Sequence, residues 1–394
     1  MMLGVKRLNK CDVFVGLWGL YYLQGIIYPQ GVINQLLQML MIIMGLEAFA
    51  KCMTSSTCGL IRASSALIIM YAVYGGIIIM FGDGISWTTD STYLKSSLNS
   101  LLPILFFYIQ AGKGSLNISR LRVYSLIMMI VIIVYYTHYG HLRALTLDEE
   151  EITNNISYMF VSLLPMVFLF HNKPVLQYGL LTILMLYIII GMKRGAILIG
   201  VIAVIIIIFS SFTDRSNVRK FFTMFLSVFI IVGLFYVIQY MMENSPYFIK
   251  RIDETLEGRS SGRDIIYSKI WDAIWNERNV LCFLFGHGAN SSIRYAGNFA
   301  HQDWLETLCN NGFVGTCILT AFFLVFAKTV MLGKRNLTPQ LFYCFLTLWI
   351  ITFLKTMFSM SIQNLDMSQG LLIGYLSYAS THEAFIDANM VRQL

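Results

Sequence analysis

Three short polar segments of this chain carry residue types that could act on an anionic substrate. The first is residues 191–196 (GMKRGA), where Lys193 and Arg194 stand side by side between two apolar runs. Arg194 opens a predicted helix, where the helix dipole disfavours a cation but backbone N–H groups favour a phosphate. A bound anion would explain the two cations, and so would side chains that extend to lipid head groups.

The second segment holds two arginines four residues apart, Arg259 and Arg263, around a Ser-Ser-Gly sequence. A guanidinium group can bind two phosphate oxygens with parallel hydrogen bonds, so the two arginines could hold a phosphate between them. Taken alone, the same sequence is more typical of a solvated basic turn.

The third segment begins at His301, which is followed by Gln302, Asp303 and Glu306. An imidazole can accept a proton near neutral pH, so His301 is the candidate general base, with its three polar neighbours in supporting roles. Asp303 and Glu306 also have the spacing of a helix capping box before an apolar run, which requires no catalytic role.

Other residues near this segment have simpler interpretations. Gly312 and Gly315 are predicted to allow close helix packing, and Trp304 is predicted to anchor the chain at the membrane interface. His287 is the nearest competitor of His301 as a base, but its position between two glycines favours a role for the backbone there.

The elements that position these segments follow from composition. Of the 394 residues, 57% are apolar and 12% are charged, against about 25% charged in a soluble domain. With a mean hydropathy of +0.67, the chain cannot cover a water-facing surface, so we predict an all-α polytopic membrane protein.

The net charge of +7 does not indicate nucleic-acid binding, because the basic residues form short clusters between apolar runs. The seven cysteines form no CxxC or Cys/His cluster, and a bridge between Cys282 and Cys309 is not expected. No metal site and no cofactor are therefore predicted. The first thirty residues lack a small-residue cleavage site and read as a first membrane span.

Apolar runs that cross or nearly cross a bilayer predict about twelve transmembrane helices. The chain then divides into helices over 1–242, a long extracytoplasmic loop at 243–303, and three further helices with the C-terminus over 304–394. The runs lie at 12–29, 31–49, 64–81, 97–111, 123–138, 157–171, 174–191, 195–213, 221–242, 304–327, 338–358 and 362–380.

Orientation follows from the lysines and arginines of the short loops, which concentrate on the cytoplasmic side. With both termini cytoplasmic, the inner connections hold most of these residues, and the long loop lies outside. The few cations left on the outer side are Lys95, Arg143, Lys193, Arg194 and Lys355.

The long loop is predicted to contain two short amphipathic helices, at 245–258 and 263–277. Ile266, Ile270 and Ile274 share one face of the second helix. Such a helix could lie at the membrane interface or pack on the membrane helices, and the sequence is compatible with both.

The order of these motifs resembles the O-antigen polymerase/ligase superfamily, which includes Wzy-type polymerases and lipopolysaccharide O-antigen ligases. The resemblance covers about residues 190–315, and the twelve-span layout extends it along the chain. Two residues depart from the usual pattern: Gln302 replaces an asparagine and Lys193 replaces a small residue. The matching motifs are KRGA at 193–196, SGR at 261–263, LFGHG at 284–288, HQDWLE at 301–306 and NNGFVG at 310–315.

The resemblance implies a metal-independent glycosyltransferase of the GT-C type in the bacterial inner membrane. It would use undecaprenyl-diphosphate-linked oligosaccharides as donor and acceptor, with a chain-length regulator as a further protein partner. The leaving pyrophosphate would be stabilised by Arg194, Arg263, Lys193 and Arg259, and His301 would deprotonate the acceptor hydroxyl.

Two alternatives remain at this point. Within the superfamily, an O-antigen ligase would transfer the glycan to lipid A–core instead of extending it. A lipid-linked oligosaccharide flippase or another transporter belongs to a different class, and such proteins usually carry ionisable groups at mid-bilayer. The predicted spans are nearly free of charge, and the HQDWLE motif favours the polymerase.

Overall fold

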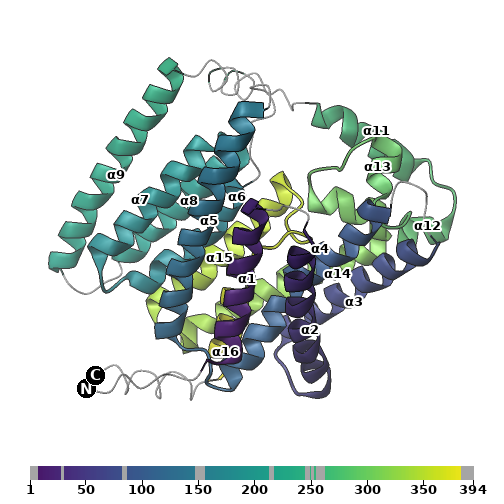
Figure 1. Cartoon of the computed structure of the whole chain (residues 1–394), viewed down its shortest axis with the longest axis horizontal. Helices are drawn as coiled ribbons and strands as arrows, with labels where there is room; N and C mark the ends of the chain where they lie inside the picture. Colours follow the sequence, from purple (N-terminus) through teal and green to yellow (C-terminus); the bar gives the residue numbers. More distant parts are fainter. Residues whose placement is uncertain are drawn as a thin grey trace.

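The computed structural model of the protein describes residues 8–27, 31–81, 87–146, 156–212, 217–244, 249, 253 and 262–382. These residues form helices and connecting segments and no β-strand, as predicted (Figure 1). In chain order the helices are α1 (Lys10–Ile27), α2 (Val32–Thr54), α3 (Gly59–Phe81), α4 (Trp87–Gly112), α5 (Ile118–Thr146), α6 (Ser157–Leu163), the 3-10 helix η2 (Leu164–Phe170), α7 (Pro174–Ile190), α8 (Arg194–Phe212), α9 (Asn217–Asn244), α11 (Arg263–Trp275), α12 (Val280–Phe285), α13 (Ser291–Ala296), α14 (Asp303–Asn336), α15 (Pro339–Phe358) and α16 (Met367–Thr381).

Each of the twelve predicted apolar runs falls on a helix or on the pair α6–η2. Six helical segments in the described residues are long and apolar enough to cross a membrane: α2, α3, residues 118–138 of α5, α8, α14 and α15. The chain is therefore an α-helical protein of membrane type, and the count of twelve spans stays a prediction.

Two helices show where the core lies. In α4, residues 101–107 are buried on every side, and α16 packs against them through Gly370 and Gly374. A Cβ on Gly374 would stand 2.5 Å from the carbonyl oxygen of Ile104, so only glycine permits this approach. By contrast, α2 exposes Leu36, Leu40 and other large apolar side chains, as expected where lipid replaces water.

The long loop packs against the start of α14. In α11, Ile270 and Ile274 are buried against Ala300, Leu305 and Cys309, so the apolar stripe faces protein. Trp271 and Trp275 lie on the exposed side of the same helix. The sequence allowed this helix either to lie at the membrane interface or to pack on the membrane helices. In the structure its isoleucine stripe packs on the bundle. The helix predicted at 245–258 falls almost wholly outside the described residues.

Opposite the loop, charged residues gather at the other end of the bundle. Lys10 of α1 donates to Glu47 of α2 at 2.8 Å, and Lys51 contacts the same carboxylate. From this end α3 runs toward the loop, where the Tyr74 hydroxyl donates to the carbonyl oxygen of Phe285. The two ends thus differ in their polar groups as well as in their connections.

Candidate functional site

His301 occupies an unusual backbone position directly before α14. Its φ is +53°, in the left-handed region that few residues other than glycine adopt and in which histidine is among the tolerated types. The side chain is half-buried. Burial lowers the pKa of His301 below its usual range, and the positive charges of Arg263 and Lys193 lower it further. Both effects favour the neutral, proton-accepting form of His301.

Arg263 and Lys193 both act electrostatically on His301, so these three predicted residues belong to one site. Arg263 opens α11, and its Nη1 donates to the carbonyl oxygen of Phe358 at 3.3 Å, at the end of α15. Lys193 stands in the turn between α7 and α8, and Arg194 follows it as the first residue of α8. Two residues that precede His301 by 38 and 108 positions in the chain therefore bring positive charge to it.

The glycines on either side of Lys193 and Arg194 explain how this turn fits. A Cβ on Gly191 would stand 1.8 Å from Ser157 Oγ. A Cβ on Gly195 would stand 2.5 Å from the Tyr158 hydroxyl and 2.8 Å from Phe358 Cβ. The turn is pressed against the start of α6 and the end of α15, which positions the two cations beside the Arg263–Phe358 contact.

The carboxylates after His301 hold other segments in place, and the capping-box prediction is wrong. The N-cap of α14 is Gln302, and no side chain caps it. Asp303 Oδ2 instead accepts hydrogen bonds from the backbone N–H groups of Ser361 at 2.7 Å and Ile362 at 3.0 Å. This buried carboxylate fixes the segment after α15 against the start of α14.

Glu306 also holds neighbouring segments in place, including the residue that precedes His301. Its carboxylate accepts hydrogen bonds from Ala300 N at 2.9 Å, Ser292 Oγ at 2.5 Å and Asn310 Nδ2 at 2.9 Å. The backbone N–H of the residue before His301 is thus bonded to Glu306, while Asp303, two residues after His301, is bonded to the segment after α15. These are positioning roles, because neither carboxylate is directed at the histidine ring by any of these bonds.

The role of Trp304 as an interface anchor stays a prediction, and the structure shows how the side chain is held. Its Nε1 donates to Thr356 Oγ1 at 2.9 Å, and its ring packs against Phe323 and Phe353. It therefore joins α14 to α15 inside the bundle.

Gly312 interrupts α14 with a φ of +66°. The interruption leaves the carbonyl groups of Cys309 and Asn310 free to accept hydrogen bonds from His287 N at 2.9 Å and Gly288 N at 3.0 Å. A Cβ on Gly312 would stand 2.3 Å from Gly286 N. The glycines of the LFGHG and NNGFVG motifs thus serve a close contact between two backbones, in agreement with the backbone role predicted around His287.

The His287 side chain belongs to a separate cluster with Glu277 and Cys282, whose ligand atoms lie within 4.8 Å of one another. Its Nδ1 is 3.0 Å from the Tyr295 hydroxyl and 3.7 Å from Glu277 Oε2. Burial lowers the pKa of His287, while Glu277 opposes that shift. These three residues could hold a metal ion, but Tyr295 and Glu277 already supply polar partners to the imidazole.

The structure reveals a buried polar network around Lys355, which the sequence analysis treated only as one of the outer cations. Lys355 is buried near the end of α15, where its ammonium group donates to Asp366 Oδ2 at 2.8 Å, Ser162 Oγ at 2.8 Å and Gln369 Oε1 at 3.2 Å. A lysine within an otherwise apolar run was the signal that could have indicated this network. The partners could not be inferred, because Ser162 is far away in sequence.

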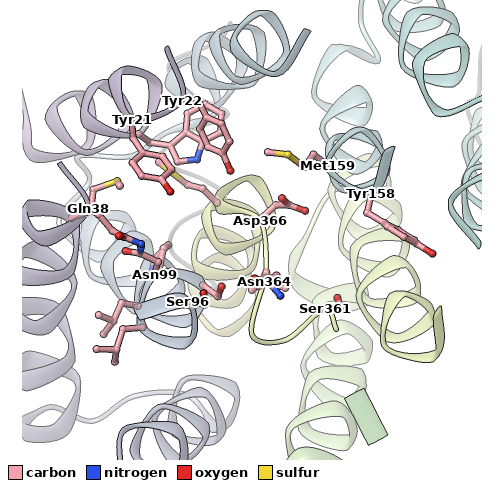
Figure 2. A pocket seen from close by; sticks show the side chains of 18 of the residues that line it. Tyr21, Tyr22, Gln38, Ser96, Asn99, Tyr158, Met159, Ser361, Asn364 and Asp366 are labelled. Carbon is pink, nitrogen blue, oxygen red and sulfur yellow. The ribbon is translucent and has the colours of Figure 1, made fainter. Parts of the chain in front are cut away.

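This network borders a cavity of about 550 Å³ between α1, α2, α4, α6 and residues 359–366. Figure 2 shows Tyr21 and Tyr22 at one side of the cavity, Asn99 and Ser96 from α4 below them, and Asp366 across from them. Tyr158 and Ser361 line the cavity and also contact the His301 site, through Gly195 and Asp303 respectively. The cavity is therefore linked to the segments around His301 and Lys193 through these two wall residues.

Among the predicted site residues, the structure brings together His301, Arg263 and Lys193, with Arg194 adjacent in the chain. Gln302, Asp303 and Glu306 lie directly beside them. Arg259 lies outside the described residues.

Neither the models of known protein families nor the curated proteins contain a match to this chain.

Proposed function

We propose that this chain polymerises lipid-linked oligosaccharide repeat units on the outer face of the bacterial inner membrane. The observation that carries the proposal is a half-buried histidine whose pKa is lowered by burial and by the positive charges of Arg263 and Lys193. A base next to fixed positive charge is what glycosyl transfer from a diphosphate donor requires.

The proposed reaction needs no group beyond these. The acceptor sugar hydroxyl gives its proton to His301 while its oxygen forms a bond to the anomeric carbon of the donor. The bond between that carbon and the phosphate oxygen breaks, and undecaprenyl diphosphate leaves with the electron pair. Lys193, Arg194 and Arg263 face the charge that develops on the leaving group, and they do so without rearrangement because their turns are fixed by the packing of Gly195 and Phe358.

The first test replaces His301 with asparagine, because asparagine also tolerates the left-handed backbone at this position. A positioned base contributes about 10²- to 10⁴-fold in rate, so His301→Asn should reduce chain extension by that factor while lipid-linked single repeats accumulate. The measurement is extension of purified lipid-linked repeats by the purified protein. His287→Ala is the comparison and should retain most of the activity. Extension by His301→Asn at close to the wild-type rate would remove His301 from the mechanism.

Arg263→Ala tests the anion-binding half of the proposal. It should severely reduce polymer formation while the protein still accumulates in the membrane, and Arg263→Lys should rescue poorly if contact is bidentate. Lys269→Ala is the matched control, because Lys269 is an exposed cation on the same helix. Equal effects of the two substitutions would indicate a general charge effect and no specific site.

The proposal also requires the loop to be extracytoplasmic. A reporter inserted near Asn290 should be active outside, and one after Lys334 should be active inside, because α14 would separate them. A cytoplasmic signal near Asn290 would contradict the proposal, since lipid-linked donors of this kind are expected on the outer face.

A flippase for the same lipid-linked substrates is a second candidate, and the buried pair Lys355–Asp366 favours it. Ionisable pairs within apolar helices often belong to transport pathways. Purified protein in vesicles distinguishes the two: movement of the lipid-linked repeat across the bilayer without a longer product would support the flippase. An O-antigen ligase would instead transfer the glycan to lipid A–core in the same assay.

A further inference from the structure

Three side chains of types that bind metal ions gather around the short helix α12. Glu277 precedes the helix, Cys282 lies within it and His287 follows it, with four residues between successive members. In the folded chain a carboxylate oxygen, the thiol sulfur and an imidazole nitrogen lie within 4.8 Å of one another. The cluster was not apparent in the sequence, because only the turn of α12 brings its members together.

The glutamate of this cluster is a largely buried anion. Its side chain is 23% exposed, and no lysine or arginine among the described residues forms a salt bridge with it. Glu277 Oε1 accepts a hydrogen bond from Asn279 N at 2.7 Å, whereas Oε2 lies 3.7 Å from His287 Nδ1, which is too long for a hydrogen bond. Within the described part of the chain the Cys282 thiol has no hydrogen-bond partner either. The carboxylate and the thiol are therefore both able to bind a cation.

The distances within the cluster fit a tetrahedral metal ion. Bonds of about 2.0–2.3 Å to a zinc ion place neighbouring ligand atoms about 3.3–3.7 Å apart. Glu277 Oε2 and His287 Nδ1 already have this separation, at 3.7 Å. The sulfur of Cys282 lies within 4.8 Å of the other ligand atoms, so side-chain shifts of about 1 Å would complete the site.

The mixture of ligand atoms favours zinc over other common ions. Mg²⁺ and Ca²⁺ prefer oxygen ligands, whereas Zn²⁺ is bound by sulfur, nitrogen and oxygen together. Cys282 releases its proton to water on binding, and the thiolate and the Glu277 carboxylate then balance the two positive charges of the ion. Three protein ligands leave the fourth position to water.

The Tyr295 hydroxyl, which lies 3.0 Å from His287 Nδ1, does not block this site. Tyr295 is 42% exposed, so water can replace the imidazole as the partner of its hydroxyl when the nitrogen binds an ion. The backbone of His287 is held independently of its ring, because its N–H donates to the carbonyl oxygen of Cys309 at 2.9 Å. The ring can therefore change partners without a change in the backbone.

We propose that Glu277, Cys282 and His287 bind one zinc ion, and that the ion holds the end of α11 and α12 to the start of α14. Glu277 follows the last residues of α11, and His287 is bonded through its backbone to the turn of α14 before the break at Gly312. The ion adds three bonds between these segments. His301 is not one of the ligands, so this inference does not depend on the proposed function.

The test uses the full-length protein in detergent, with any affinity tag removed and with zinc chloride as the probe. Competition with a coloured chelator should show one zinc ion per chain with a Kd of about 1 µM or lower, and zinc should raise the melting temperature of the protein. Cys282→Ser and His287→Gln should each weaken binding about 100-fold or more, because even the loss of a residue that only supports a ligand costs about 10- to 100-fold. Glu277→Gln should weaken it about 10-fold or more.

Two further measurements separate the loss of a ligand from the loss of the fold. Without zinc, the variants should melt at the same temperature as the wild type. With cobalt chloride in place of zinc, the wild type should show the near-ultraviolet absorption of a cobalt–thiolate bond, and Cys282→Ser should not.

Cys317→Ser is the matched control for the cysteine, because Cys317 is an exposed thiol of α14 outside the cluster. His382→Gln is the control for the histidine, since His382 is also exposed. Both should keep the wild-type affinity, and an excess of magnesium or calcium should not displace zinc. The proposal is overturned if the wild type binds zinc no more tightly than Cys282→Ser and His287→Gln. Equal losses in Cys317→Ser and Cys282→Ser would overturn it as well.

Discussion

The ion pairs at the two ends of the helical bundle differ in their exposure to solvent. At one end, Lys10 and Glu47 form an ion pair with side chains 51% and 43% exposed. At the other, Lys355 and Asp366 form a pair of the same length with side chains 3% and 12% exposed. Both pairs are 2.8 Å long, so the difference lies in their surroundings.

The surroundings determine what each pair can contribute. An exposed pair gains little, because water and salt screen it and two long side chains lose freedom. A buried pair must overcome the cost of removing both charges from water, and it persists only when further hydrogen bonds satisfy it. Ser162 and Gln369 supply those bonds to Lys355. The comparison therefore predicts a small contribution to stability from the exposed pair and a large cost for breaking the buried one.

Lys355→Met should have the largest effect, because it leaves the carboxylate of Asp366 buried without its partner. Breaking a buried pair in this way costs about 3–5 kcal/mol. Reversible unfolding of the purified protein by denaturant in mixed micelles would measure the loss. The double variant Lys355→Met/Asp366→Leu should recover most of the stability, because no lone charge remains. A loss below about 1 kcal/mol for Lys355→Met alone would show that the two ends are equivalent.

Lys193→Gln should change the pH dependence of activity. In the proposed reaction His301 must be neutral to accept a proton, so activity should fall as pH decreases through its pKa. Arg263 and Lys193 lower that pKa, which extends activity to lower pH. Removing the charge of Lys193 should raise the pKa toward the ordinary value of about 6.5 and move the acid limb of the rate profile to higher pH.

The quantity to compare is the pH at which the rate falls to half its maximum on the acid side. The maximal rate itself also changes if Lys193 contacts the substrate. Lys269→Gln should leave the limb where it is. A limb that stayed in place in Lys193→Gln would mean that this charge does not act on the group that titrates.

Lys10→Met should have the smallest effect, although it is the same chemical change as Lys355→Met. The Lys10–Glu47 pair is exposed, and Glu47 keeps its contact with Lys51. The expected change in unfolding free energy is about 0–1 kcal/mol, and it should shrink further as salt is added. A loss comparable to that of Lys355→Met would refute the distinction between the two ends.

The fold was largely predictable from sequence, because apolar runs and their interruptions are local signals. The second loop helix was predicted at 263–277 and observed as Arg263–Trp275, with the stripe of Ile270 and Ile274 facing inward. The grouping of His301 with Arg263 and Lys193 was expected only from the order of the motifs, and the structure agrees with it.

The remaining details depend on contacts between distant residues, which no local pattern encodes. Asp303 and Glu306 had the spacing of a capping box, yet Asp303 bonds to residues 58 and 59 positions further along the chain. The local capping hydrogen bond does not form because these distant N–H groups need an acceptor in the buried interior. Lys355 appeared to be one isolated cation near a span end, and only the folded chain brings Ser162 to it.

The break in α14 at Gly312 indicates how deep in the lipid bilayer the candidate site lies. Residues 313–336 alone rise about 36 Å at about 1.5 Å per residue, which already exceeds a hydrocarbon layer of about 30 Å. The turns before the break, from Asp303 to Asn311, are therefore not needed to cross the lipid and can stand at the level of the head groups. A diphosphate held by its lipid tail lies at that same level. We therefore expect the substrate to reach His301 by sideways diffusion within the leaflet, with its tail still in the bilayer.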